Sequence, residues 1–254
     1  MIFKLVLAFL AAFGAGNMNA VTGGGTFLTY PMLLLLGNSS IVANGTSTVL
    51  LWPGVFASLF GYKDEIRQSK YWIKILCLPA LAGAVVGSFV LTHTPQNVFD
   101  FVAPILIAIG ATILQFQAQI IRLFGISHLD QSKRKTMVVA FLVFAIGTYG
   151  AYFGAGIGIL LIGSLSILGF GDLLETIGLK NVLSLLVNLV AAIYFSFSGI
   201  VHWQIVPLMT CGVILGGYSG SRLVHHVNRE YVRRAVVMLG FGIAITLLTI
   251  RLSK

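Results

Sequence analysis

Two long stretches of this chain contain no ionisable residue. Lys4 and Lys63 bracket 58 residues without Asp, Glu, Lys, Arg or His, and Lys135 and Asp172 bracket another 36. Only 9% of the 254 residues are charged, 57% are hydrophobic, and the mean hydropathy is +0.97. Soluble domains average about 25% charged residues. The chain is therefore predicted to be an all-α polytopic membrane protein whose solvent is the bilayer.

The same apolar stretches set the number of membrane segments. A helix needs about 20 apolar residues to cross the hydrocarbon layer, so the chain has room for about eight to ten segments and for no soluble domain. Two pieces, 2–37 and 137–171, contain a glycine-rich break near the middle. Each is predicted to form two short helices folded back at the break, either as a hairpin or as a tilted full-length pair. Full spans are predicted at 43–61, 72–91, 98–118, 177–196, 203–224 and 234–251.

An internal repeat relates the two halves of the chain. An offset of 133 residues superposes six pairs of glycines: Gly14 and Gly147, Gly23 and Gly156, Gly25 and Gly158, Gly45 and Gly178, Gly83 and Gly216, and Gly87 and Gly220. Each half is therefore predicted to be one copy of an ancestral unit.

The charges of the connecting loops indicate how the two copies are oriented. The loop at 62–71 carries three Lys or Arg residues, whereas its counterpart at 196–202 carries none; the next pair reverses this, with none at 92–97 and three at 225–234. Lys and Arg accumulate in cytoplasmic loops. Equivalent loops would therefore lie on opposite sides, which is the inverted-topology arrangement of many transporters.

Three segments follow from these patterns. Residues 1–118 are predicted to be the first inverted repeat, 119–136 a cytoplasmic connector, and 137–254 the second repeat. Each repeat would consist of a glycine-broken helical hairpin and three transmembrane helices.

The glycine-rich breaks at 14–26 and 147–158 are the first candidates for a binding site. Unpaired backbone groups cost several kcal/mol each in lipid, so irregular backbone persists only where it is buried in protein or lines a polar cavity. A helix that restarts after a break offers free N–H groups and the positive end of its dipole, which suits an anion. Alternatively, these glycines only allow close helix packing, as Gly83-x-x-x-Gly87 and Gly216-x-x-x-Gly220 are predicted to do.

Lys180 is a cation within a predicted span. Such a charge costs at least about 2.5 to 3.5 kcal/mol unless something offsets it. It is either a lysine that extends toward the membrane surface or a cationic anchor for an anionic ligand, and Asn188 lies on nearly the same helical face. The candidate substrate-binding residues are Asn17, Asn19, Thr22, Gly23, Gly24, Gly25, Asn44, Thr46, Ser47, Gly156, Gly158, Lys180, Asn181 and Asn188.

The sequence lacks the residues that several classes of function require. No acidic residue lies in the middle of a predicted span, no phosphate-binding G-x-x-x-x-G-K-[ST] loop is present, and all five histidines fall in connectors or at segment ends. The chain is therefore not predicted to be an enzyme, and no catalytic residue, metal site or cofactor is expected. The net charge of +9 sits mostly in short connectors, where it indicates topology and anionic lipid rather than nucleic acid.

Several short motifs together resemble the TauE/SafE sulfite exporter family. They are Val21-Thr-Gly-Gly-Gly-Thr-Phe-Leu-Thr-Tyr-Pro31, Ala43-Asn-Gly-Thr-Ser-Thr, Lys180-Asn-x6-Asn188, Gly199-x3-Trp203 and Gly216-x3-Gly220-Ser-Arg222. The resemblance covers both halves and implies a secondary carrier of small organosulfur anions such as sulfite or sulfonates. Leu179 stands where the family commonly has Thr before the lysine.

The resulting hypothesis is a permease of the cell inner membrane. It would move a small anion, sulfite or an organosulfonate, by alternating access at a midplane site between the repeats. An anion channel is one alternative. A membrane-embedded sulfur-relay or assembly protein that uses Cys77 and Cys211 is another. The expected partners are the anion and the lipid bilayer, and the sequence leaves open whether the protein is a monomer or a homodimer.

Overall fold

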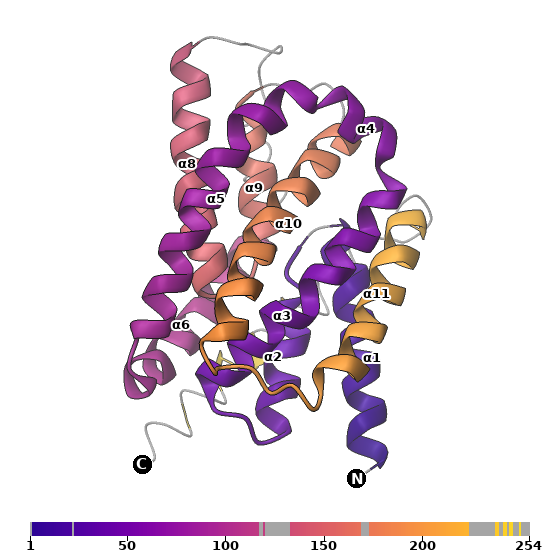
Figure 1. Ribbon diagram of the computed structural model, residues 1–254, viewed down its shortest axis with the longest axis vertical. Helices are drawn as coiled ribbons and strands as arrows, with labels where there is room; N and C mark the ends of the chain where they lie inside the picture. The colour runs from indigo at the N-terminus through magenta and orange to yellow at the C-terminus, as the bar shows by residue number, and fades with distance from the viewer. Residues whose placement is uncertain are drawn as a thin grey trace.

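The computed structural model describes residues 2–21, 23–116, 133–168 and 173–223, with residue 119 and scattered residues between 237 and 249. Within these ranges all regular structure is helical, which confirms the predicted all-α class (Figure 1). The elements are α1 (Ile2–Val21), α2 (Thr26–Leu35), α3 (Ser40–Ser58), the 3-10 turn η1 (Leu59–Gly61), α4 (Lys63–Gln68), α5 (Lys70–His93), α6 (Gln96–Gln115), α8 (Lys133–Tyr152), α9 (Ile157–Ser166), α10 (Leu173–Phe197) and α11 (Val206–Leu223).

Among the described residues, five helices are long and apolar enough to cross a membrane: α1, α5, α6, α8 and α10. Five of the six predicted full spans coincide with helices α3, α5, α6, α10 and α11. Helices α3 and α11 have 19 and 18 residues and are not among the five membrane-length apolar helices. The sixth predicted span, 234–251, lies mostly outside the described residues.

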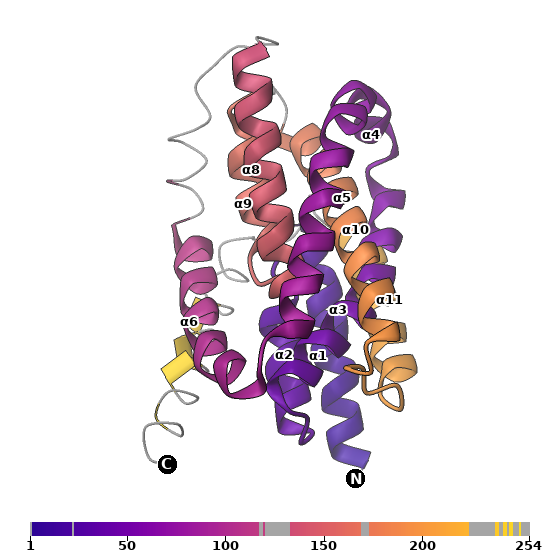
Figure 2. The ribbon, with the colours of Figure 1, turned by 60° about the vertical axis from the view of Figure 1, so that its left-hand side comes forward.

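Both glycine-rich pieces break inside the predicted intervals, but only in their later part, since 14–21 and 147–152 remain helical. Helix α1 ends at Val21 and α2 begins at Thr26, while α8 ends at Tyr152 and α9 begins at Ile157. The two helices of each piece, here called its arms, are unequal in length rather than both short. The long arms, α1 and α8, have 20 residues, or about 30 Å of helix, whereas the short arms, α2 and α9, have 10, or about 15 Å. Figures 1 and 2 show α1 and α2 in the lower part of the molecule and α8 and α9 in its upper part.

Glycine contacts hold the long arms against neighbouring helices. Helix α11 packs along α1, and α5 packs along α8. A Cβ atom on Gly216 would overlap the backbone oxygen of Phe13 on α1, and one on Gly87 would overlap that of Thr148 on α8. These overlaps confirm the prediction that the two G-x-x-x-G pairs serve close packing.

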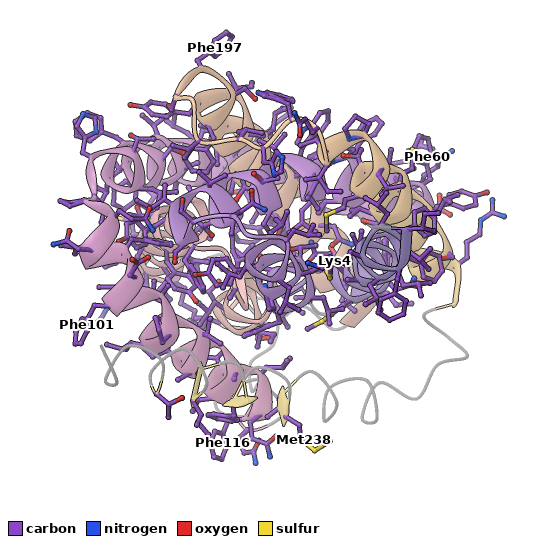
Figure 3. All side chains as sticks on the ribbon, turned by 90° about the horizontal axis from the view of Figure 1, so that it is seen from below. Lys4, Phe60, Phe101, Phe116, Phe197 and Met238 are labelled. Atoms are coloured by element: carbon purple, nitrogen blue, oxygen red, sulfur yellow. The ribbon has the colours of Figure 1, made fainter. Side chains whose placement is uncertain are left out.

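Large apolar side chains lie on the outside of the bundle. Phe60, Phe101, Phe116 and Phe197 project from its periphery in the view of Figure 3, and each is at least half exposed. The buried face of α1 carries small residues instead, among them Ala8, Ala12 and Ala15. Lipid is as apolar as leucine, so membrane helices associate through close packing of small residues rather than through burial of large ones. The observed distribution is the one expected of a protein surrounded by lipid.

Replacing Gly216 by alanine tests the contact between α1 and α11. The added Cβ would overlap the Phe13 carbonyl oxygen, so the two helices must separate. Overpacking typically costs about 1–3 kcal/mol, and we expect a clear drop in the melting temperature of the detergent-purified protein, followed by tryptophan fluorescence. Gly242→Ala is the matched control, because no described residue lies within 4 Å of its Cβ position. Equal melting temperatures for the two variants would contradict the packing role.

Candidate functional site

The two glycine-rich breaks touch each other. Gly23 adopts a left-handed backbone conformation with a φ of +84°, and a Cβ atom there would lie 2.6 Å from the Cα of Gly158 in the first turn of α9. Gly154 and Gly156, in the second break, also have positive φ values of +80° and +78°. Residues with a Cβ rarely adopt this conformation. Glycine is therefore required both for the turn and for the close approach of the two backbones.

A small cavity lies beside this contact. Its wall is formed by Asn19, Gly23, Thr26, Leu51, Val55, Gly154, Ile157, Ser184 and Asn188. About 10 Å³ is open to the centre of a water molecule, which is room for roughly one water. The polar members of the wall are uncharged amides and hydroxyls from α1, α2 and α10. The cavity is thus a small space with a partly polar wall, to which both halves of the chain contribute.

The amino-terminal ends of two helices reach this cavity. Thr26 is the first residue of α2 and Ile157 is the first residue of α9, and both line the wall. Asn19 Oδ1 accepts a hydrogen bond of 2.7 Å from the backbone N–H of Gly25, the residue that precedes α2. Helix amino-terminal ends carry a partial positive charge. Two such ends at one uncharged cavity favour an anion over a cation.

The carboxyl end of α1 is held by side chains from other elements. Lys180 Nζ donates a hydrogen bond of 3.0 Å to the carbonyl oxygen of Asn19. Asn181 Nδ2 and the Tyr62 hydroxyl both donate to the carbonyl oxygen of Ala20, at 3.1 and 3.2 Å. The last carbonyl groups of a helix lack partners within the helix and carry partial negative charge. A lysine that is only 1% exposed is therefore stabilised in this position.

The carboxyl end of α8 is held in a similar way. Asn44 Nδ2 donates a hydrogen bond of 2.8 Å to the carbonyl oxygen of Tyr152, the last residue of α8. In both cases an asparagine near the start of a long helix, α3 or α10, binds the end of a broken helix in the other half. The Oδ1 atoms of Asn44 and Asn181 are buried and have no hydrogen-bond partner in the described part of the chain.

The structure therefore separates the predicted site residues into groups. Asn19, Gly23 and Asn188 line the cavity, and Gly158 contacts Gly23. Lys180 does not line the cavity; it lies behind the wall and binds the backbone of Asn19.

The remaining predicted residues lie elsewhere. Asn17 faces α11, where its Oδ1 accepts a hydrogen bond from Ser219. The Thr46 hydroxyl accepts from the backbone N–H of His202, and the hydroxyls of Ser47 and Thr29 lie 2.6 Å apart. The other predicted glycines pack against neighbouring residues: Gly24 against Met18 and Phe27, Gly25 against Ala15, and Gly156 near Gly110. Thr22 lies outside the described residues.

Two cavity residues with polar side chains, Thr26 and Ser184, are absent from the predicted set, as are Leu51, Val55, Gly154 and Ile157. Ser184 lies four residues after Lys180 and four before Asn188 on α10, so all three share one helical face. That spacing is a usable signal once Lys180 and Asn188 are singled out. Thr26 closes the first glycine-rich break, and its position at the start of α2 is the corresponding signal.

Comparison with known proteins adds the family. The profile of the sulfite exporter TauE/SafE family matches residues 8–247, nearly the whole chain. The chain belongs to this family. As a TauE/SafE protein it is a multi-pass membrane protein of a transporter family, and not an enzyme. The resemblance expected from the sequence motifs is thereby confirmed.

Curated TauE/SafE relatives are similar over almost their full lengths. A probable membrane transporter protein, ORF9, of Sinorhizobium sp. is 30% identical over 250 residues, which cover 96% of this chain and 92% of the relative. One from Haemophilus influenzae is 27% identical over 93% and 91% of the two chains, and YfcA of Escherichia coli K12 is 24% identical over 92% and 86%. No solved structure matches the chain significantly.

Substituting Asn19 by alanine tests how the first break is held. The variant removes the acceptor of the Gly25 N–H, and an orphaned buried donor typically costs about 1–3 kcal/mol. We expect a lower melting temperature than that of the wild type. Asn17→Ala is the control, because the Asn17 amide bonds within α1 and Ser219 retains acceptors in its own helix. A loss of stability in Asn17→Ala equal to that in Asn19→Ala would refute the special role of Asn19.

Proposed function

We propose that this chain is a secondary transporter that moves a small anion, sulfite or an organosulfonate, across the inner membrane by alternating access. The observation that carries the proposal is the contact of the two glycine-rich breaks beside a polar cavity, at which two helix amino-terminal ends meet. Broken helices whose amino-terminal ends point at an anionic group near the midplane are a recurrent design of secondary transporters.

Paired contacts support two inverted repeats. Helix α11 packs on α1 as α5 packs on α8, and the glycine pairs that mediate these contacts are those superposed by the offset of 133 residues. Asn44 on α3 binds the end of α8, and Asn181 on α10 binds the end of α1. Each half therefore holds the broken helix of the other half. A twofold axis in the membrane plane would account for this exchange.

The charge distribution around the cavity supports an anionic substrate. No Asp or Glu lines its wall. Lys180 lies behind the wall, linked to it through Asn19. Its positive charge would act on the cavity over a short distance in a medium of low dielectric constant, where electrostatic interactions are strong. We therefore propose that Lys180 attracts the anion without lining the site in this conformation.

Contacts at both ends support a closed intermediate of the transport cycle. At the lower end of Figure 1, the loop after α10 covers the start of α3: the backbone N–H of His202 donates to Thr46, and a Cβ on Gly45 would lie 2.7 Å from the Ile200 oxygen. At the upper end, Tyr62 packs with Ile162 and Ile177 in a small apolar cluster separate from the main core. Opening one end at a time would expose the cavity to one side.

The membrane potential can drive such a carrier. The upper end carries the basic loop at 62–71, which we assign to the cytoplasm on the strength of its three Lys and Arg residues. An inside-negative potential contributes about 2.3 kcal/mol per charge per 100 mV. Export of a monoanion would therefore need no coupling ion.

Ligand-induced stabilisation tests the proposed function. The melting temperature of the detergent-purified protein would be measured with sulfite, sulfate, thiosulfate, sulfoacetate, taurine, phosphate and acetate, beside the Lys180→Ala variant. A ligand at 100 times its Kd stabilises by about 2.7 kcal/mol, so we expect a shift confined to sulfur oxyanions or sulfonates and weakened in the variant. A cooperative melt that no anion shifts would exclude a tight-binding carrier and favour a weak-binding channel.

Exchanging both cysteines for serine tests the sulfur-relay alternative. Cys77 is half-buried on α5, Cys211 is exposed on α11, and neither lines the cavity. We expect the double variant to keep anion uptake into proteoliposomes within about twofold of the wild type, since each change only replaces a sulfur atom by oxygen outside the cavity. Loss of uptake in a variant with an unchanged melting temperature would instead support a relay through the two thiols.

A further inference from the structure

Ser184 has an unusual hydroxyl for a serine within a helix. Helical serines commonly donate to the carbonyl oxygen three or four residues earlier. Six helical serines in the described part of the chain do so, namely Ser58, Ser164, Ser166, Ser196, Ser219 and Ser221. Ser184 is 5% exposed, yet its Oγ has no partner in the described part of the chain. A buried polar atom without a partner lowers the stability of the folded protein.

The position of Ser184 in the cavity wall gives a reason for its missing hydrogen bond. It lines the cavity beside the two breaks, one helical turn after Lys180 and one turn before Asn188. Asn188 Nδ2 donates to the Ser184 backbone oxygen at 2.8 Å, which fixes the amide against this turn of α10. Thr26 contributes a second hydroxyl from the first turn of α2, and it lies close to Gly154 of the second break. Hydroxyls from two helices thus line a space that also receives two helix amino-terminal ends.

We propose that the Ser184 hydroxyl is a ligand-binding group that donates its hydrogen bond to an oxygen of the transported oxyanion. The inference rests on the proposed function, since it assigns a binding residue to the same cavity. A hydrogen bond from a hydroxyl to a charged oxygen is about twice as strong as one between neutral groups. The anion is then the partner that the Ser184 hydroxyl lacks among the described residues, and Thr26 serves a second oxygen of the same ion.

The chemistry of the wall selects an oxyanion. A Ser or Thr hydroxyl offers a single donor, so two hydroxyls from different helices can each bind a separate oxygen of one ion. A ligand with several charged oxygens satisfies both donors together. The wall has no carboxylate to accept a proton from the ligand or to bind a cation.

Ser88 provides a matched control. It is a second buried serine whose Oγ has no partner in the described part of the chain, and it is 0% exposed. It lies on α5 and does not line the cavity. Ser184→Ala and Ser88→Ala therefore delete the same atom from similarly buried positions, and only the first deletion changes the wall of the cavity.

The test measures two quantities in the wild type and both variants. The first is the melting temperature without ligand, which should be equal to or higher than that of the wild type in both, because each change removes an unpartnered buried hydroxyl. The second is the Kd for sulfite, sulfate and sulfoacetate, from the dependence of the melting temperature on anion concentration. We expect Ser184→Ala to raise the Kd of the best-bound anion at least tenfold and Ser88→Ala to leave it unchanged.

Three outcomes would overturn the inference. A Kd for Ser184→Ala within twofold of the wild-type value would show that the hydroxyl does not bind the anion, while leaving the proposed function intact. A clear drop in the ligand-free melting temperature of Ser184→Ala would show a structural role instead. Absence of anion binding in the wild type would overturn the proposed function and this inference with it.

Discussion

The structure depends on how the backbone groups at the ends of α1 and α8 are satisfied. Both helices stop inside the protein, and an unpaired backbone group costs several kcal/mol in the membrane interior. Lys180, Asn181 and Tyr62 supply the donors for α1, and Asn44 supplies one for α8. These polar residues are thus retained in an apolar chain because the broken helices require them.

This requirement brings the other features of the site together. Three of the donors lie on α3 and α10, namely Asn44, Lys180 and Asn181, so these two helices must lie against the ends of the broken helices. The breaks then meet at Gly23 and Gly158, where any side chain would separate them. The positive ends of α2 and α9 consequently share one cavity, and the face of α10 that carries Lys180 also presents Ser184 and Asn188. The residues that pair the last carbonyl groups of α1 and the residues proposed to bind the ligand are therefore neighbours on the same helix.

The candidate site could be predicted only in part, because the sequence does not show how each helix is rotated about its axis. The sequence identifies Asn19, Gly23 and Asn188, since polar or glycine residues inside apolar runs are few. It also groups Asn17 with Asn19, although the two point in different directions: Asn17 faces α11, and Asn19 faces the cavity. Ser184 escapes notice because a serine inside a membrane helix usually bonds to its own backbone. Its missing bond is visible only in three dimensions.

Local sequence patterns were sufficient to predict the all-helical membrane class, the helices α3, α5, α6, α10 and α11, both breaks, and the family. These features follow from local hydropathy and from glycine, which act over one or two helical turns. The tertiary structure alone decided that the long arms have 20 residues, that the breaks touch, and that Lys180 binds the end of α1 rather than lining the cavity. Those outcomes depend on contacts between residues up to 161 positions apart in the chain. Which side chains meet is set by how each helix is rotated about its axis against its neighbours.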